Sequence, residues 1–283
     1  EFAALTKEAG FPDGVFNVVT GLGAEAGSAL VDHPGVAKIT FTGSDATGAR
    51  IYAQAAKSMK RVSLELGGKS PAIVLADADM GLAIPGIARG IFANAGQVCV
   101  AGSRVYAHRS ICDALVEALA KAASAMRLGH GLDPASDLGP LIHARQAERV
   151  DAYVREGCAA GAQATSGGEA SGAFYAPTVL TGVREDMRLM REEIFGPVVD
   201  VEEALALANG TSYGLAASVW TESLSQAHRL AAEIRAGTVW INCHSYFSPE
   251  LPKGGHKQSG WGYENGAQGL DNYLETKTVC AVI

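Results

Sequence analysis

Hydrophobic and polar positions alternate along the chain between helical and strand patterns, which is typical of a layered α/β protein. In the first part, helical patterns cover residues 2–10, 24–32 and 46–57, and Gly10 closes the first of them. Apolar runs between these helices predict three short strands: Val15–Val19, Ala37–Phe41 and Arg61–Leu64. Ala37–Phe41 has the composition of a buried strand.

A second unit begins near Ser70 and repeats the alternation. Its predicted strands are residues 71–75, 105–108, 174–180, 215–220 and 237–242, and its predicted helices are residues 80–93, 110–126, 143–160, 200–209 and 223–236. Pro85 lies inside the first helix, which therefore starts late or kinks there. Gly237 stands where a glycine closing the last helix is expected.

The C-terminal residues 272–283 end in an apolar run. If this segment is extended, Val279, Ala281 and Ile283 share one face. The pattern predicts a strand that needs a partner sheet, which a second subunit could supply.

Composition narrows the class of protein. With 283 residues, 48% apolar and 19% charged, the chain has the composition of a soluble globular protein of one large or two ordinary domains. A formal charge of −7 argues against nucleic acid or an anionic membrane as partner. No apolar run reaches membrane-spanning length, and no signal peptide is visible. Five widely spaced cysteines without a C-x-x-C pair favour a reducing cytoplasm, and neither they nor the histidines have metal-site spacing.

One cysteine has an unusual setting. Cys99 lies in the glycine-flanked loop of residues 93–104, and Glu65 lies upstream in the run Leu64-Glu65-Leu66-Gly67-Gly68-Lys69-Ser70-Pro71. A thiolate that attacks a carbonyl and a carboxylate that activates water are complementary roles in covalent catalysis. The alternative for Cys99 alone is a small, inert, buried thiol.

Two further runs could contact phosphate. Phe41-Thr42-Gly43-Ser44-Asp45-Ala46-Thr47-Gly48 follows a strand and opens a helix, where free N–H groups could bind a pyrophosphate. The alternative is an ordinary helix capped by Ser44. Gly21-Leu22-Gly23 superficially resembles a dinucleotide fingerprint, but its spacing is wrong and favours a plain strand-to-helix turn.

Two acidic or basic runs complete the candidates. Glu192-Glu193-Ile194-Phe195-Gly196-Pro197 sets carboxylates beside an aromatic side chain, which could hold ribose hydroxyls and line a nicotinamide ring, or could be a solvated helix end before a core Phe. The glycine-rich loop 252–260 could border an active site or merely turn the chain. Glu264 follows this loop. It is a candidate proton acceptor, and the favoured alternative is an ordinary surface charge.

Together these runs closely resemble the aldehyde dehydrogenase superfamily. The matching pieces, in the family order, are GVFNVVTG, ITFTGSDATG, LELGGKSP, NAGQVCVAGSR, EEIFGPV, YGLAASVWT, GTVWIN and GGHKQSGWG. The resemblance implies an aldehyde dehydrogenase-like α/β fold with a partial Rossmann-type cofactor domain (1–67), an α/β catalytic domain (68–270) and an oligomerisation strand (271–283). It also implies a homodimer or homotetramer.

The resemblance assigns roles to individual residues. It implies that Cys99 is the nucleophile, Glu65 the general base and Glu264 a proton relay. The residues implied to bind the cofactor, NAD or else NADP, are Gly23, Gly43, Ser44, Gly48, Leu66, Glu193 and Phe195. Those implied to line the substrate pocket are Val98, Val100, Phe247 and Lys253. No metal is implied.

The implied reaction oxidises an aldehyde to a carboxylic acid through a thiohemiacetal and a thioester on Cys99. Glu65 favours hydrolysis of the thioester, because relatives that transfer the acyl group to coenzyme A generally lack this base. The alternatives are a catalytically impaired scaffold or binding subunit of the same fold, and a reductive relative that acts on an activated acyl group.

The sequence also departs from the family pattern. It begins where the first part of the cofactor domain should be complete and lacks the asparagine loop of the oxyanion hole, which favours a fragment of a longer enzyme over an impaired one. Val199-Asp200 joins stretches that are normally further apart. Lys253 stands where an aromatic often lines the substrate tunnel, which predicts a preference for aldehydes with a distal carboxylate; alternatively its charge reaches solvent.

Overall fold

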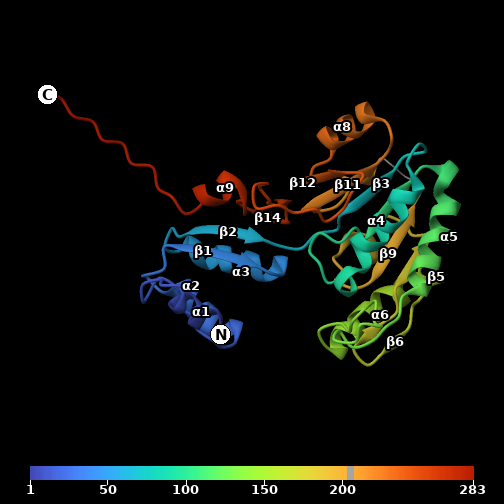
Figure 1. The fold of residues 1–283 in the computed structure, drawn as a ribbon, viewed down its shortest axis with the longest axis horizontal. Coiled ribbons are helices and arrows are strands. Elements are labelled where there is room, and N and C mark those ends of the chain that lie inside the picture. The colour runs from blue at the N-terminus through green and yellow to red at the C-terminus, as the bar shows by residue number, and fades with distance from the viewer. Residues whose placement is uncertain (203–206) are drawn as a thin grey trace.

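Two β-sheets organise the chain, and a short buried segment joins them (Figure 1). The computed structural model describes residues 1–202 and 207–283 and confirms the α/β class. The smaller sheet has the order β1-β2-β14, with β1 (Lys38–Thr42) parallel to β2 (Arg61–Glu65) and β14 (Gly260–Trp261) antiparallel to it. β2 is therefore the central strand, and Glu65 stands at its C-terminal end.

Four short helices accompany the smaller sheet at the left of Figure 1. They are α1 (Phe2–Glu8), the π-helical turn η1 (Gly23–Gly27), α2 (Ser28–Asp32) and α3 (Asp45–Ala56). A small core of Ala55, Val62, Leu64 and Leu66 lies between α3 and the strands. β1 confirms the strand predicted at 37–41, but this strand is only partly buried, since it is the edge of this sheet.

Among the described residues, seven strands form the larger sheet, in the order β12-β11-β3-β4-β9-β8-β5. Neighbouring strands are parallel except for the antiparallel pair β5–β8. Their bounds are β3 (Pro71–Val74), β4 (Arg104–Ala107), β5 (Gln163–Ser166), β8 (Thr178–Thr181), β9 (Val198–Glu202), β11 (Ala216–Trp220) and β12 (Thr238–Ile241). A parallel sheet needs cover on both faces, and here helices supply it.

Alternate residues of each strand point to opposite cores. Ala72 and Val74 of β3 belong to the core beneath α4 (Met80–Phe92) and α5 (Arg109–Ala125). Ile73 faces the other core, with α6 (Ala144–Ala159), α7 (Arg188–Arg191) and part of α8 (Leu224–Glu233). α4 continues through Pro85, so it does not start late.

The remaining short elements lie in connections. They are η2 (Ala93–Gly96), β6 (Ala170–Ser171), β7 (Phe174–Tyr175), β10 (Tyr213–Gly214), β13 (His256–Lys257) and α9 (Gly266–Asp271). None of the described helices is long and apolar enough to cross a lipid bilayer. Residues 66–70 are all buried and run directly from β2 to β3, so this segment is the junction between the two sheets.

Three expectations about elements are wrong. Val15–Val19 forms no strand and is exposed, because no described strand pairs with it. The helix expected at 200–209 is a strand over residues 200–202, while 203–206 lie outside the described residues. Gly237 does not cap α8, whose C-cap is Ile234; instead a Cβ at Gly237 would overlap the carbonyl oxygen of Gly254, so close backbone approach explains the glycine.

The C-terminal tail has no strand within the described chain. Residues 272–283 extend away from the body of the molecule (Figure 1). Val279 and Val282 are exposed there, and no strand among the described residues pairs with the tail. Pairing of this tail with a second copy stays a prediction.

Candidate active site

Cys99 lies in a constrained loop between η2 and β4. Asn94 and Ala95 have φ values of 52° and 54°, in the left-handed region that non-glycine residues rarely adopt. Gly96 follows with φ 70°, and a Cβ there would overlap the carbonyl oxygen of Gly196. Such backbone strain persists only where surrounding contacts enforce it. The cysteine loop is therefore held against the loop that contains Glu193.

The paired glycines of the junction let three loops meet. A Cβ on Gly67 would overlap the Glu193 carboxylate, and a Cβ on Gly68 would lie 2.5 Å from the carbonyl oxygen of Cys99. The N–H of Gly68 also donates to Oε1 of Glu193, at 3.2 Å. Any side chain at these two positions would push the cysteine, Glu193 and the junction apart. The glycine pair is thus required by close approach rather than by a turn.

Glu65 is a buried carboxylate with one free oxygen. Its residue is 2% exposed, its Oε2 lies 3.3 Å from the Lys253 ammonium, and its Oε1 has no partner among the described residues. Burial raises the pKa of Glu65 to about 7, against an opposing effect of the nearby Lys253 ammonium. Buried polar atoms without partners are rare, and at a reaction centre they are available to water or substrate. A carboxylate with a pKa near neutrality suits a general base.

The Cys99 thiol shares this environment. Burial raises its pKa, the Lys253 ammonium lowers it, and the negative charges of Glu193 and Glu65 raise it further. The contacts around Gly67 and Gly68 place the Cys99 backbone and the Glu193 carboxylate against the same junction that follows Glu65. These residues come from separate segments of the chain.

Lys253 faces two carboxylates. Its Nζ lies 3.3 Å from Oε2 of Glu65 and 4.0 Å from Oε2 of Glu264. The amine thus points into the site, and its side chain is only 19% exposed, so the alternative in which the charge reaches solvent does not hold. Glu264 is 35% exposed, which leaves it open to solvent on its other side.

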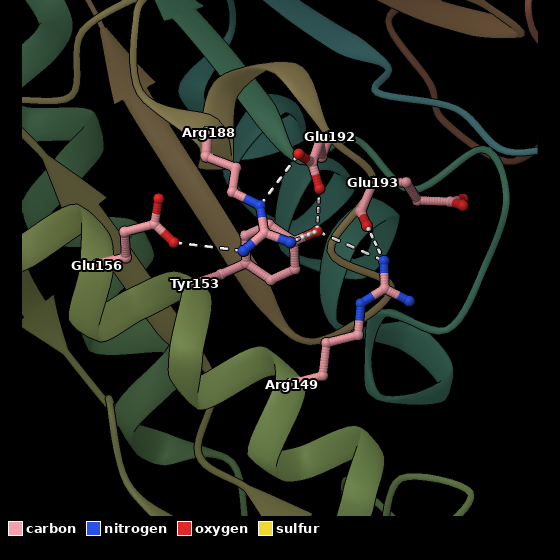
Figure 2. Close-up of polar contacts among 6 residues, drawn as sticks. All are labelled: Arg149, Tyr153, Glu156, Arg188, Glu192 and Glu193. Atoms are coloured by element: carbon pink, nitrogen blue, oxygen red, sulfur yellow. Dashed lines mark hydrogen bonds and ion pairs between the residues drawn. The ribbon is translucent and has the colours of Figure 1, made fainter.

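A polar cluster holds the loop with Glu193 in place (Figure 2). Arg149 of α6 donates to the carbonyl oxygen of Glu193, and the Tyr153 hydroxyl donates to Oε2 of Glu192, at 3.2 and 2.6 Å. The Arg188 guanidinium stacks on the Tyr153 ring, 4.3 Å from its centroid. The Glu193 side chain points away from this cluster, so its backbone is anchored while its carboxylate faces Gly67 and Gly68.

The rest of this loop is also fixed. Gln146 donates to the carbonyl oxygens of Ile194 and Phe195, at 3.2 and 2.9 Å. Phe195 has a φ of 55° and a side chain that stays 37% exposed, which is unusual for a large aromatic. Burial raises the pKa of Glu193 to about 7, and the hydrogen bond from Gly68 opposes this shift.

A buried chain of hydrogen bonds reaches the residue after the cysteine. His244 Nε2 lies 2.9 Å from the carbonyl oxygen of Val100, which can only accept, so this nitrogen carries the proton. Nδ1 then accepts from Ser218, whose hydroxyl oxygen accepts from the Trp220 indole. Burial lowers the pKa of His244, which keeps the ring neutral and this tautomer in place.

The remaining predicted residues divide between the two sheets. Ser44 caps α3 by accepting from the N–H of Thr47, at 3.3 Å, so the capping role that was the alternative for Ser44 is confirmed. Gly43 donates its N–H to the carbonyl oxygen of Glu65, at 3.1 Å. A Cβ on Gly48 would lie 2.6 Å from the Leu66 side chain, so these two residues pack α3 against the junction.

Gly23 lines a hollow of about 750 Å³ between α2, β1 and α3, together with Thr47 and Arg50. Its walls are mostly apolar with a few polar groups, which is typical of a ligand site. Gly23 and Thr47 of α3 therefore border the same space, and their contact with a cofactor stays a prediction.

Of the predicted substrate-pocket residues, Phe247 is 49% exposed and packs edge-on against Trp240. Val98 is partly buried, whereas Val100 is 2% exposed and packs with Leu215 and Trp240 in a small core. The Val100 side chain thus packs into this core, and its carbonyl oxygen accepts the hydrogen bond from His244.

Several supporting residues were not predicted from the sequence. They are Gln146, Arg149, Tyr153, Arg188, Ser218 and His244. The helical pattern at 143–160 puts Arg149 and Tyr153 on one face, but only the fold shows which loop that face contacts. Among the described residues, no group of three or more metal-binding side chains comes together.

Comparisons with known proteins show the family to which the chain is similar. A model of the aldehyde dehydrogenase family matches residues 1–279. Betaine aldehyde dehydrogenase of Brucella anthropi is 46% identical over 98% of the chain, which covers 59% of that protein. An NAD+ complex of an aldehyde dehydrogenase from Bacillus cereus is 48% identical with a TM-score of 0.95, over 98% of this chain and 58% of that one. A structure of betaine aldehyde dehydrogenase from Staphylococcus aureus is 39% identical with a TM-score of 0.94, over 97% of this chain and 57% of that one. The chain thus spans less than two thirds of these relatives' length.

Proposed function

The chain belongs to the aldehyde dehydrogenase family, and on this premise we propose that its protein oxidises an aldehyde to a carboxylic acid with NAD+ through a covalent intermediate on Cys99. The observation that carries the proposal is that the Gly67–Gly68 pair lets the Cys99 loop pack against the segment that follows Glu65, whose buried carboxylate keeps one oxygen without a partner. NAD+ is favoured over NADP because the similar Bacillus cereus structure is an NAD+ complex.

Cys99 begins the reaction as a thiolate that adds to the aldehyde carbon. The Lys253 ammonium favours this ionised form, because it lowers the pKa that burial has raised. The strained turn at Asn94–Ala95 and the hydrogen bond from His244 to the Val100 carbonyl hold the sulfur in one place. A fixed nucleophile lowers the entropy cost of reaching the attack geometry.

The residues around Glu193 suit a dinucleotide. The buried Glu193 carboxylate can accept hydrogen bonds from ribose hydroxyls, the half-exposed Phe195 ring can pack on a flat aromatic group, and the hollow beside Gly23 and Thr47 has room for an adenosine. When bound, NAD+ supplies the hydride acceptor that converts the thiohemiacetal to a thioester. The chain's own contribution is to anchor the loop that presents Glu193 and Phe195.

Glu65 completes the cycle. Its free Oε1 can hold a water molecule beside the thioester and take a proton from it as the water attacks, which releases the acid and restores the thiolate. Lys253 lies between Glu65 and the partly exposed Glu264, so the proton can leave toward solvent along that side. The betaine aldehyde dehydrogenases among the relatives do not by themselves name this protein's aldehyde.

Two variants of the natural protein test the proposal. Cys99→Ala should abolish both aldehyde oxidation and ester hydrolysis, because both need the nucleophile. Glu65→Gln should still release one equivalent of NADH per active site in a burst but turn over about 10²–10⁴ times more slowly. Cys243→Ala is the matched control, since it removes a thiol from the exposed loop after β12. Oxidation that survives Cys99→Ala would leave a binding scaffold of the same fold as the better explanation.

We retain two expectations as proposals. The exposed C-terminal tail pairs with a second copy of the chain in a homo-oligomer, as its apolar face suggests. The spacing of the five cysteines, without a C-x-x-C pair, supports a cytoplasmic location.

A further inference from the structure

Lys253 has an unusual environment for a lysine beside a general base. Its ammonium lies 3.3 Å from one Glu65 oxygen and 4.0 Å from a Glu264 oxygen, with four-fifths of its side chain buried. A flexible lysine normally extends its charge into water. This one is directed inward, toward the two carboxylates that the proposed reaction needs.

The backbone fixes this direction. Lys253 and Glu264 exchange two backbone hydrogen bonds, of 2.7 and 2.6 Å, which hold the two residues opposite each other. Gly254 is packed too closely for any side chain, since its Cβ would lie 2.5 Å from the Gly262 carbonyl oxygen, and its own carbonyl lies against Gly237. The Cα of Lys253 therefore has little freedom, and its amine reaches Glu65 from a defined position.

The charges around these groups are few and can be named. Glu65 faces Lys253 and Glu264, and Cys99 faces Lys253, Glu193 and Glu65. Lys253 is the single cation that acts on both reacting groups in the described part of the chain. It lowers the pKa of Glu65 and the pKa of Cys99, whereas Glu264 raises the pKa of Glu65. Without it, burial and the neighbouring negative charges would disfavour both ionised forms still further.

We propose that Lys253 is a positioning residue whose inward-directed ammonium favours the ionised forms of the Glu65 carboxylate and the Cys99 thiol in one buried site. This inference rests on the proposed function and deepens it. It replaces the expectation that Lys253 selects aldehydes with a distal carboxylate: a substrate carboxylate would be a third anion around an ammonium that already faces two. The Lys253 ammonium thus binds carboxylates of the enzyme itself and not a carboxylate of the substrate.

The first test measures the thiol without any substrate or NAD+. The rate of Cys99 alkylation by iodoacetamide is followed against pH in the natural protein, with the modified peptide identified by mass spectrometry. Lys253→Met should raise the midpoint by about one pH unit, so that alkylation below the midpoint slows about tenfold. Lys253→Arg keeps the charge and should restore most of the wild-type profile.

Lys257→Met is the matched control. Lys257 lies in the same glycine-rich loop, but its amine donates to the carbonyl oxygens of Asn209 and Thr211 and faces Arg104 and Arg235. Removing this charge should leave the Cys99 profile unchanged. A Lys253→Met profile that coincides with those of wild type and Lys257→Met would overturn the proposal.

The second test measures the base. Acyl-Cys99 is formed with p-nitrophenyl acetate, and its hydrolysis is followed against pH by intact-protein mass spectrometry. Lys253→Met should move the midpoint upward, whereas Glu264→Gln should move it downward, since Glu264 opposes ionisation of Glu65. If Lys253→Met fails to fold, Glu264→Gln still tests the proposal. An unchanged pH midpoint for hydrolysis of acyl-Cys99 in this variant would refute the electrostatic effect of the neighbouring charges on Glu65.

These outcomes separate the two proposals. A protein whose Cys99 is alkylated with the expected shifts but which oxidises no aldehyde retains the role of Lys253 and loses the proposed function. A protein that oxidises aldehydes with no shift in either profile retains the function and loses the role of Lys253.

Discussion

At the scale of single residues, Glu65 shows how burial creates a base. An exposed glutamate is ionised at neutral pH but is a weak base, because its pKa lies well below 7. Removal from water raises the pKa of Glu65 to about 7, and Lys253 limits this rise. The balance leaves a carboxylate that is both basic enough to take a proton from water and still largely ionised slightly above neutrality.

The pH dependence of thioester hydrolysis follows from this value. Below pH 7 Glu65 is protonated and cannot act as a base, so the hydrolysis rate should rise about tenfold per pH unit and level off above about pH 7. Single-turnover hydrolysis of acyl-Cys99 between pH 5 and pH 9 measures this. In Glu65→Gln the profile should be flat and low, and a wild-type rate that is independent of pH over this range would contradict the assignment.

The same shift has a cost in stability. The pKa of Glu65 is about 7 in the folded protein and 4.5 in its ordinary state, so between these values the unfolded chain releases a proton that the folded protein keeps. Stability therefore falls as pH rises through this window, by up to about 3 kcal/mol. Glu65→Gln should remove this dependence and raise the free energy of unfolding at pH 8 by about 1–3 kcal/mol, as urea unfolding at pH 5 and pH 8 would measure.

At the scale of elements, the loop with Glu193 depends on helix α6. Arg149 donates to the Glu193 carbonyl oxygen, and Tyr153 one turn later binds Glu192 (Figure 2). The loop has strained backbone at Phe195, which needs such external contacts to persist. Helix α6 thus supports the proposed cofactor site by binding the backbone of Glu193 and Phe195.

Arg149→Met tests this support. Loss of its hydrogen bond to the loop should weaken NAD+ binding by about 1 kcal/mol, or about fivefold in Kd, with little change in ester hydrolysis. Arg155→Met is the control, because Arg155 lies on the same helix but pairs with Asp151 at the surface. Titration of NAD+ by protein fluorescence measures both, and equal affinities in the two variants would count against the loop's dependence on α6.

The elements were largely predictable, because their signals are local. Ser44, Asp79 and Ser223 cap helices where the polar residue precedes an apolar pattern. The errors arise where the deciding partner is distant. Val15–Val19 has the composition of a strand, but a strand needs a neighbour. Gly237 resembles a cap until Gly254 is seen against it.

The site was predictable only in part. Cys99 and Glu65 were identified through motifs, since nothing local to either residue says that they meet. Their approach depends on Gly67 and Gly68, whose neighbours come from loops some 30 and 125 residues further along the chain. The contact between Lys253 and Glu65 depends on β14, which pairs with β2 and brings the C-terminal loop to Glu65. Such long-range pairings leave no periodic signal in the sequence.

At the scale of the whole molecule, the site occupies the junction between the two sheets. Residues 66–70 are buried and carry the chain from Glu65 to β3. Lys69 in this segment pairs with Asp200 of β9 at 3.4 Å, and both side chains are fully buried. Arg104 lies beside them and donates to the Lys69 carbonyl oxygen. The position of Glu65 relative to the larger sheet therefore depends on this charged cluster.

The cluster predicts an asymmetry between two variants. Asp200→Asn would remove the paired anion of Lys69 from beside two buried cations, Lys69 and Arg104, and leave Lys69 only the smaller effect of Glu193, whereas Lys69→Met would leave Asp200 still facing Arg104. Breaking a buried pair costs about 3–5 kcal/mol, and Asp200→Asn should lie at the upper end and Lys69→Met below it. Urea unfolding measures both, and the double variant should lose less than the sum of the two because the partners interact directly. The single variants could instead lose the same free energy of unfolding, with the double variant losing their sum. Arg104 would then not share the charge of Asp200, and the junction would be held by packing around Gly67 and Gly68 alone.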